Sequence, residues 1–223
     1  MKNNLPTIMI LAIASTIYIC YAYFKKNNQK TGIVIILNGP SASGKSSIQK
    51  EFQSLMMPNL WIKHGIDSLF DQPVPDITLE NMSFWQSENP IRLITTTQDT
   101  DNNNVITLYT GNQGDKVAYG MNSAIAAYAT KGSNIIVDYI AYKKEWLEDL
   151  QQKLNGITTY WVKVSIPLST LEQREIARAT SPKGHARSHY NTVHWNIKYD
   201  FEVNSEKDSA KVIAQHIKDF IKA

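Results

Sequence analysis

The sequence predicts an α/β domain in which a five-stranded parallel sheet lies between two layers of helices. From residue 32 onward, short β-branched runs alternate with amphipathic stretches, and this alternation is typical of parallel strands connected by helices. About 190 residues follow that point, which suffices for one sizeable core but not for two ordinary domains. The hydrophobic fraction of 43% and the charged fraction of 19% are those of a globular protein.

The elements follow from the position of these patterns. The predicted strands occupy residues 33–37, 61–66, 135–138, 159–164 and 199–203. The predicted helices occupy residues 46–55, 116–130, 143–154, 168–178 and 207–222. Apolar residues of the last helix recur at helical spacing, which indicates a face that packs on the core.

Residues 71–115 interrupt the alternation. This stretch is rich in Asn, Asp, Thr and Pro and shows no long helical period. Inside it, residues 92–97 and 105–110 flank the turn-forming residues 99–104, which predicts a projecting β-hairpin. The insertion either shapes a substrate pocket, as loops on a rigid scaffold often do, or forms a solvated surface loop.

The N-terminal residues form a separate unit, which we place at residues 1–31, before a domain at residues 32–223. Residues 5–24 are apolar and uncharged, about the length that crosses a ~30 Å hydrocarbon core as a helix. Three lysines follow directly: Lys25, Lys26 and Lys30. These lysines favour a cytoplasmic position for the domain, and the length of the apolar run favours a retained membrane anchor, because the apolar region of a signal peptide has only ~7–15 residues. The alternative is export by a signal peptide, with Cys20 and Ala22 before the cleavage site.

Charge and cysteine content exclude several classes of function. The net charge is +3, and the basic residues are scattered along the chain, which argues against nucleic acid as a partner. Cys20 is the only cysteine, so the domain has neither an internal disulfide nor a cysteine-based metal site. The sequence does not fix the oligomeric state.

The most specific motif is a complete phosphate-binding loop of the form G-x-x-x-x-G-K-[ST]. It follows an apolar strand and opens a helix, which is the setting that the mechanism of phosphate binding requires. The residues that we expect to bind ATP are Gly39, Pro40, Ser41, Ala42, Ser43, Gly44, Lys45, Ser46 and Ser47.

Each key position of the loop has a physical task. Gly39 and Gly44 let the backbone curl around an anion, so that N–H groups and the helix N-terminus converge on the phosphates. Lys45 adds a cation for the β- and γ-phosphates, and the Ser46 hydroxyl is placed to ligate Mg²⁺. The loop therefore predicts Mg²⁺ and ATP as ligands.

Two carboxylates end predicted strands at the edge where ligand crevices open. Asp138 follows an apolar run and is placed to hold Mg²⁺ as a Walker B acid does; the alternative is a cap for the following helix. Asp67 ends the strand at residues 61–66. It either accepts a proton from an attacking hydroxyl or caps a helix.

Two arginines precede a segment that is typical of a kinase lid. Arg174 and Arg178 lie four residues apart on one helical face, and residues 179–187 after them contain Pro and Gly without a hydrophobic period. Lid arginines stabilise the transferred phosphoryl group; the alternative is pairing with the nearby Glu172 or Glu175. The histidines of this region do not form a patterned metal site, and we expect lid or surface residues at His185, His189 and His194.

Together these motifs resemble the chloramphenicol phosphotransferase-like P-loop kinases from residue 32 to the C-terminus. The resemblance rests on Ile35-Ile36-Leu37-Asn38-Gly39, Gly65-Ile66-Asp67-Ser68-Leu69, Ile135-Ile136-Val137-Asp138, Arg174-Glu175-Ile176-Ala177-Arg178, Val193-His194 and Tyr199-Asp200. It implies a three-layer P-loop kinase fold with a lid and an inserted β-hairpin. It also implies transfer of the ATP γ-phosphate to a hydroxyl, with Asp67 as general base.

The lid departs from the pattern of that family. Family members usually carry a compact Gly-Asp-Arg lid after the arginine helix, whereas this chain has Ala-Thr-Ser-Pro-Lys-Gly-His at residues 179–185. A lid arginine is therefore missing or is replaced by Lys183 or Arg187. The departure bears on the acceptor, which the sequence does not identify.

We therefore expect an ATP-dependent O-phosphotransferase that acts on a small hydroxylated molecule, such as an antibiotic. One alternative is a kinase for a sugar or nucleotide-sugar, as in the zeta-toxin kinases. The other is a membrane-tethered nucleotide-binding module without an acceptor, which would need no base at Asp67.

Overall fold

The computed structural model describes residues 30–66, 75–100, 102–179 and 181–222 of the 223-residue chain. Five parallel strands form its central sheet, in the order β2-β5-β1-β6-β7. The strands are β1 (Val34–Asn38), β2 (Trp61–Gly65), β5 (Asn134–Tyr139), β6 (Thr159–Ser165) and β7 (Phe201–Asn204). The predicted parallel sheet is thus confirmed.

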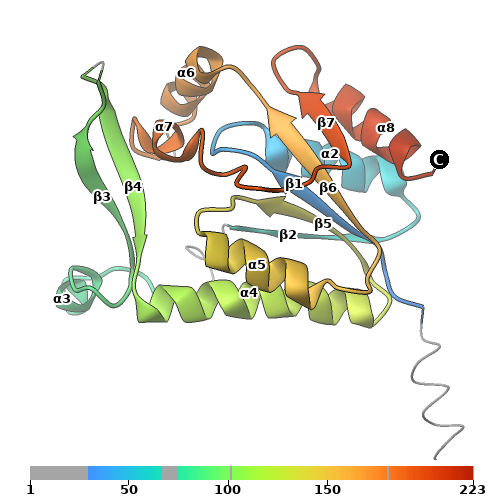
Figure 1. Cartoon of the computed structure of the whole chain (residues 1–223), viewed down its shortest axis with the longest axis horizontal. Helices are drawn as coiled ribbons and strands as arrows, with labels where there is room; N and C mark the ends of the chain where they lie inside the picture. The colour runs from blue at the N-terminus through green and yellow to red at the C-terminus, as the bar shows by residue number, and fades with distance from the viewer. Residues whose placement is uncertain (1–29, 67–74, 101, 180, 223) are drawn as a thin grey trace, which may run out of the picture.

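Helices cover both faces of this sheet (Figure 1). Their bounds are α2 (Lys45–Met56), α3 (Met82–Trp85), α4 (Asn112–Thr130), α5 (Lys144–Lys153), α6 (Leu168–Arg178), α7 (His185–His189) and α8 (Ala210–Phe220). One face packs against α4 and α5, and the other packs against α2 and α8. The architecture therefore has three layers, as the sequence predicts.

Strand β1 explains why the core has two halves. Its residues are all fully buried, and successive side chains point to opposite faces. Val34 and Ile36 join the α4–α5 side of the core, whereas Ile35 and Leu37 join the α2–α8 side. A nearly continuous apolar run is what a strand covered on both faces requires.

The register of the sheet brings the ends of three strands together. Asp138 on β5 pairs with Leu37 on β1 and with Gly65 on β2. The phosphate loop begins directly after β1, so it starts beside Asp138 at the carboxyl edge of the sheet. Ligand crevices of such sheets open at this edge.

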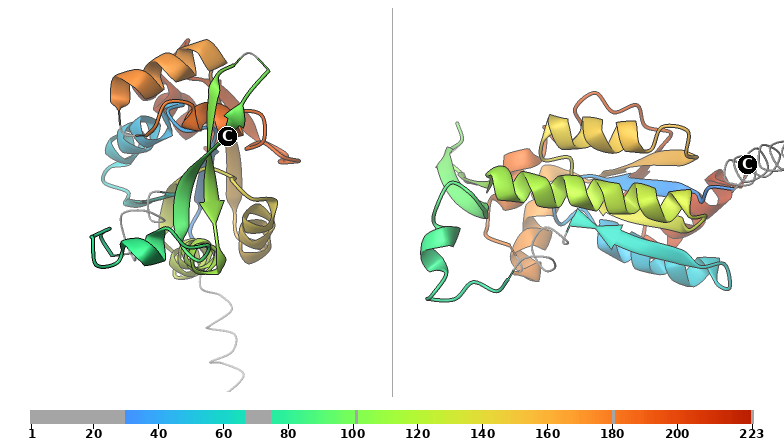
Figure 2. Two further views of the ribbon diagram at one scale, coloured as in Figure 1. Left: turned by 90° about the vertical axis from the view of Figure 1, so that its left-hand side faces the viewer. Right: turned by 90° about the horizontal axis from the view of Figure 1, so that it is seen from below.

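The predicted hairpin is also present. Strands β3 (Ile91–Gln98) and β4 (Asn104–Thr110) pair antiparallel, with an irregularity between Thr95 and Gln98. The hairpin rises from the N-terminal end of α4 towards α7 (Figure 2). At its upper end the Ile106 N–H donates to the Gly184 carbonyl over 3.2 Å, so the hairpin contacts the lid region.

The structure differs from the predicted elements at several boundaries. Helix α4 begins at Asn112, because the Gly111 carbonyl already accepts the Asp115 N–H over 3.0 Å. The insertion therefore ends before Asp115. Helix α8 begins only after Ser209, whose hydroxyl caps the Val212 N–H. Helices α3 and α7 have four and five residues, too few to show a helical period in sequence.

The apolar N-terminal segment at residues 5–24 lies outside the described residues. Among the residues that the structure describes, no helix is both long and apolar enough to span a membrane.

Candidate active site

The phosphate loop curls because of its backbone conformation. Ala42 and Gly44 have φ angles of 62° and 94°, a left-handed conformation that glycine adopts without strain. At Gly39, a Cβ atom would come within 2.5 Å of the Val164 carbonyl oxygen, so no larger residue fits beside β6. Consecutive N–H groups in such a curve form a cradle for an anion.

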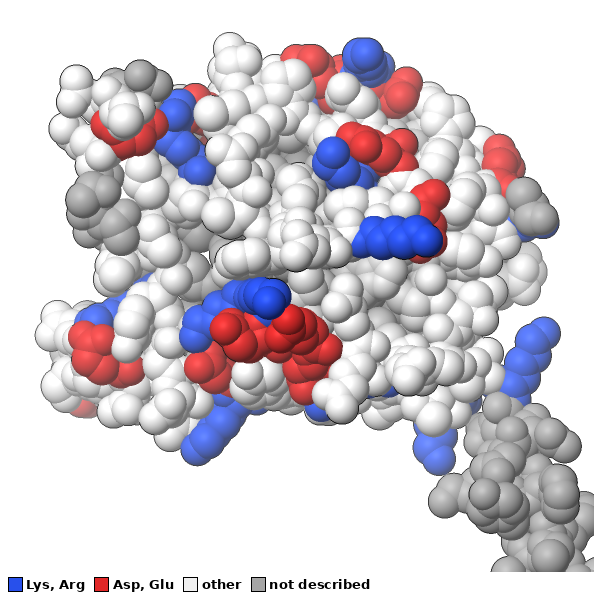
Figure 3. All heavy atoms as spheres, viewed as in Figure 1, with Lys and Arg blue, Asp and Glu red and all other residues white. Residues whose placement is uncertain are grey.

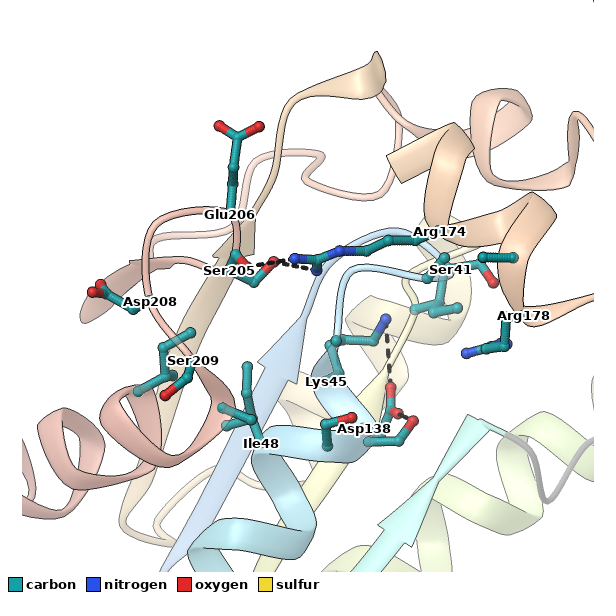
Figure 4. Close-up of a pocket in the computed structure, with 18 of the residues that line it drawn as sticks. Ser41, Lys45, Ile48, Asp138, Arg174, Arg178, Ser205, Glu206, Asp208 and Ser209 are labelled. Carbon is teal, nitrogen blue, oxygen red and sulfur yellow. Dashed lines mark hydrogen bonds and ion pairs between the residues drawn. The ribbon is translucent and has the colours of Figure 1, made fainter. Parts of the chain in front are cut away.

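Three side chains meet at the start of α2. The Ser46 hydroxyl donates to Asp138 Oδ2 over 2.5 Å, and Lys45 Nζ lies 3.5 Å from Asp138 Oδ1. Lys45 Nζ also donates to the Pro40 carbonyl over 2.7 Å, which folds its side chain back over the loop (Figure 4). Asp138 is 8% exposed and turns to the loop, so its carboxylate does not act as the helix cap that the sequence left open.

The Ser46–Asp138 pair suits a magnesium ion chemically. A hydroxyl and a carboxylate are oxygen donors, which Mg²⁺ prefers, and at nucleotide sites it takes only one or two carboxylates besides phosphates and water. Within the described residues there is no cluster of three or more His, Cys, Asp or Glu side chains. Because it offers one hydroxyl and one carboxylate, the Ser46–Asp138 pair fits Mg²⁺ bound together with phosphates.

A cavity of about 720 Å³ lies over the loop. It extends from the phosphate loop and Asp138 to the turn between β7 and α8. That turn contributes residues that the sequence analysis missed: Ser205, Glu206, Lys207, Asp208 and Ser209. Because these residues follow the last strand at the carboxyl edge of the sheet, their position in the sequence could have indicated that they border the cavity. The predicted final helix instead included residues 207–209, which lie before α8.

The two candidate arginines both line this cavity but face different parts of it. Arg174 donates to the Ser205 carbonyl over 2.7 Å and to the Ser205 hydroxyl over 3.2 Å. Arg178 points towards Lys45 and Asp138 (Figure 4). Glu172 binds Arg187, and Glu175 accepts two backbone N–H groups of α7 and its cap. Arg174 is therefore held by Ser205 and not by either glutamate.

The candidate base lies outside the described residues. Asp67 follows Ile66, which lines the nucleotide cavity, and Gly65, which pairs with Asp138. Its role as base therefore stays a prediction.

Comparison with known proteins decides the family. The model of the family described as chloramphenicol phosphotransferase-like protein matches residues 32–222. The chain belongs to the chloramphenicol phosphotransferase-like family. A Mycobacterium tuberculosis protein named "Putative O-phosphotransferase" is 27% identical over 189 residues, which cover 83% of this chain and 80% of the relative.

Solved structures show the same fold. The Mycobacterium tuberculosis APS kinase CysC, in complex with AMPPNP and APS, matches with a TM-score of 0.56 and 15% identity over 86% of this chain and 99% of its own. A gluconokinase from Sinorhizobium meliloti matches with a TM-score of 0.51 and 15% identity over 87% of this chain and 94% of its own. With its family, the chain is a P-loop kinase.

The lid of this family member is held by acidic side chains. Arg187 binds Glu172 over 2.6 Å and Asp99 at the hairpin tip over 2.7 Å. Glu175 accepts N–H groups from the two sides of His185, over 2.8 Å from Gly184 and 2.7 Å from Ala186. Neither Arg187 nor the exposed Lys183 lines the nucleotide cavity. Of the two alternatives that the sequence left open, this arrangement favours a missing lid arginine over its replacement by either residue.

Two of the histidines are buried in α7, which overlaps the predicted lid, so of the two expected positions they occupy the lid and not the surface. His185 and His189 are each 4% exposed; His185 lies against Ile106 of the hairpin, and His189 lies against Tyr142. His189 Nε2 accepts the Ser41 N–H over 3.0 Å. His194 is half-buried, and its Nδ1 lies 2.7 Å from the Tyr199 hydroxyl. Burial raises the pKa of Tyr199 to about 12, so this hydroxyl stays protonated at neutral pH.

A second cavity, of about 860 Å³, lies between α3, α4 and the base of the hairpin. Its walls are mostly apolar, and His64, Gln113 and Lys116 are their polar side chains. The apolar part includes Phe84, Trp85, Ile91, Val117 and Met121. His64 immediately precedes Gly65, the partner of Asp138. The second cavity therefore reaches the same end of β2 that borders the nucleotide cavity.

Proposed function

We propose that this kinase transfers the γ-phosphate of ATP to a hydroxyl group on a small, largely apolar molecule. The observation that carries the proposal is the contact of Lys45 and Ser46 with Asp138 at the mouth of a curled phosphate loop. A second cavity at the same edge of the sheet supplies room for the acceptor.

On the nucleotide side, the backbone of residues 39–47 cradles the phosphates. Arg178 points towards Lys45 (Figure 4), and the positive charges of these two side chains would stabilise the transferred γ-phosphoryl group. Arg174, tied to Ser205, faces the β7–α8 turn and closes the other end of the cavity. Ser46 and Asp138 would hold Mg²⁺, which neutralises charge on the phosphates during transfer.

On the acceptor side, the second cavity favours an apolar molecule over a sugar. A sugar presents hydroxyl groups on all sides, and buried hydroxyls that lack a partner weaken binding. The walls carry few polar side chains, whereas Phe84, Trp85 and Met121 offer apolar surface. Asp67, near the end of β2, would accept the proton of the attacking hydroxyl.

Location and further partners are part of the proposal. Residues 5–24 would anchor the chain, with the kinase domain in the cytoplasm, where ATP is available. On the face drawn in Figure 3, Lys and Arg side chains are interspersed with Asp and Glu. That face has no continuous basic stripe of the kind that nucleic acid would need.

The test is ATP consumption by the full chain in detergent against a panel of hydroxylated compounds. The panel contains apolar aromatic alcohols, chloramphenicol among them, and matched sugars. We expect ADP formation that depends on an acceptor from the apolar group. A chain that binds ATP but forms no ADP with any acceptor would instead be a nucleotide-binding module.

A matched pair of variants on α4 tests the acceptor cavity. Gly120 lines it, and a Cβ atom there would meet no atom within 4 Å. Gly120→Leu therefore adds a Cβ atom without a clash and places an apolar side chain at the cavity wall, and we expect a higher KM for the acceptor with ATP affinity unchanged. Ser123→Leu, exposed on the same helix and outside the cavity, is the control. Equal effects of both variants would contradict the assignment.

A further inference from the structure

The buried side chain of His189 contacts the phosphate loop. Its Nε2 accepts the Ser41 N–H over 3.0 Å, so the ring proton is on Nδ1, which lies 3.2 Å from the Ser188 hydroxyl. Burial lowers the pKa of His189 well below its usual value, and the charges of His185 and Lys45 act in the same direction. The ring is therefore neutral at physiological pH and available as an acceptor.

The opposite end of α7 is bonded to the hairpin. His185 Nδ1 lies 3.2 Å from the Ile106 carbonyl oxygen, and the Gly184 carbonyl accepts the Ile106 N–H over 3.2 Å. Gly184 has a φ angle of 96°, and a Cβ atom there would lie 2.2 Å from the Asn104 carbonyl oxygen. This close backbone approach fixes α7 against β4, and the Arg187–Asp99 pair adds a contact at the hairpin tip.

Tyr142 joins the two histidines into one cluster. Its hydroxyl lies 3.0 Å from His185 Nε2, and its ring centre lies 4.9 Å from that of His189. The two imidazole rings are themselves 4.8 Å apart. The path of contacts from the hairpin to the phosphate loop is therefore continuous: Ile106, His185, Tyr142, His189 and Ser41.

The polar side chains of this cluster indicate a role in orienting the groups that they bind, beyond packing. Apolar side chains would fill the same volume without the cost of burying polar rings, whereas bonded polar groups fix one orientation of each ring. At one end of the cluster, His189 contacts Ser41, which lines the nucleotide cavity. The hairpin end belongs to the element whose Ile91 lines the second cavity.

We propose that His189 positions the phosphate loop by accepting the Ser41 N–H, and that α7 thereby couples the hairpin to nucleotide binding. The inference rests on the proposed function for the identity of the nucleotide. Without this hydrogen bond, the loop is less ordered before ATP binds, and binding has to order it. The affinity for ATP, measured without any acceptor, is therefore the direct readout.

Two substitutions at this position separate the hydrogen bond from the volume. His189→Leu keeps an apolar volume but lacks an acceptor, and we expect roughly tenfold weaker Mg²⁺-ATP binding in calorimetry, the scale of ordering one residue. His189→Gln offers a carbonyl acceptor at similar reach and should restore affinity to within about threefold. Equal affinities of both variants, whether both reduced or both like wild type, would overturn the positioning role.

The hairpin end of the coupling has its own matched pair. Arg187→Met removes the ion pairs with Asp99 and with Glu172 at a residue outside the nucleotide cavity, and it should weaken Mg²⁺-ATP binding. Arg92→Met breaks the ion pair with Glu88 at the hairpin base and should leave binding unchanged. Wild-type affinity in Arg187→Met would overturn the coupling.

A measurement without nucleotide keeps this inference distinct from the proposed function. In ¹⁵N NMR of the histidine rings, His189 should show a proton on Nδ1 and a bare Nε2. A proton on Nε2 would overturn the inference whatever the chain binds. A correct tautomer in a wild-type chain that binds no Mg²⁺-ATP would refute the proposed function and, with it, the coupling to nucleotide binding.

Discussion

Glu175→Gln tests whether the lid is held by a buried carboxylate. Glu175 is 1% exposed and accepts two backbone N–H groups. The amide keeps one acceptor but turns an NH₂ group against the other N–H. Losing a hydrogen bond to a charged group costs about 1.5–3 kcal/mol, and the N–H left without a partner adds to it. We expect a loss of about 3 kcal/mol in the free energy of unfolding.

Differential scanning calorimetry measures this loss directly. For a domain of this size, 1 kcal/mol shifts Tm by about 2–4 °C, so Glu175→Gln should melt about 6–12 °C lower. The control is Glu172→Gln, one turn earlier on α6. Its side chain is 29% exposed in an ion pair with Arg187, and such pairs contribute at most about 1 kcal/mol. A Glu175→Gln melting point within about 2 °C of wild type would refute the reasoning.

Three further predictions concern the nucleotide, pH and the membrane. Lys45→Ala removes the cation from the phosphates, so Mg²⁺-ATP affinity in calorimetry should fall at least roughly tenfold; wild-type affinity would contradict the loop assignment. Burial lowers the pKa of His185 and His189, so the unfolded chain binds more protons below about pH 6.5. Stability in urea should therefore be full above that pH and fall below it, less steeply in His189→Gln; equal slopes would contradict this. Protease added to intact cells should leave the kinase domain uncut, whereas digestion would indicate an exported domain.

The sequence predicted those features of the site that are formed within one short segment of the chain. The phosphate loop was recognisable because its glycines and Lys45 act within one short segment. Asp138 was recognisable because the end of an apolar strand marks the carboxyl edge of the sheet. The β-hairpin was recognisable because polar turn residues separate two β-branched runs.

Contacts between distant segments could not be predicted in this way. Ser41 and His189 are 148 residues apart, and Arg174 and Ser205 are 31 apart, so no spacing rule relates them. The position of β5 between β1 and β2 likewise depends on pairing between segments that are far apart in the chain. The burial of His185 depends on the hairpin that covers it.

The central claim is transfer of a phosphoryl group from ATP to a hydroxyl. Its most direct test is a single-turnover reaction of the full chain with γ-labelled ATP and the acceptor that the panel identifies. The label should appear on the acceptor hydroxyl. In Asp67→Asn, transfer should fall ~10²-fold or more, as expected for loss of a general base, while Mg²⁺-ATP affinity is retained. Label recovered only as inorganic phosphate, from wild type in the presence of every acceptor, would contradict the account.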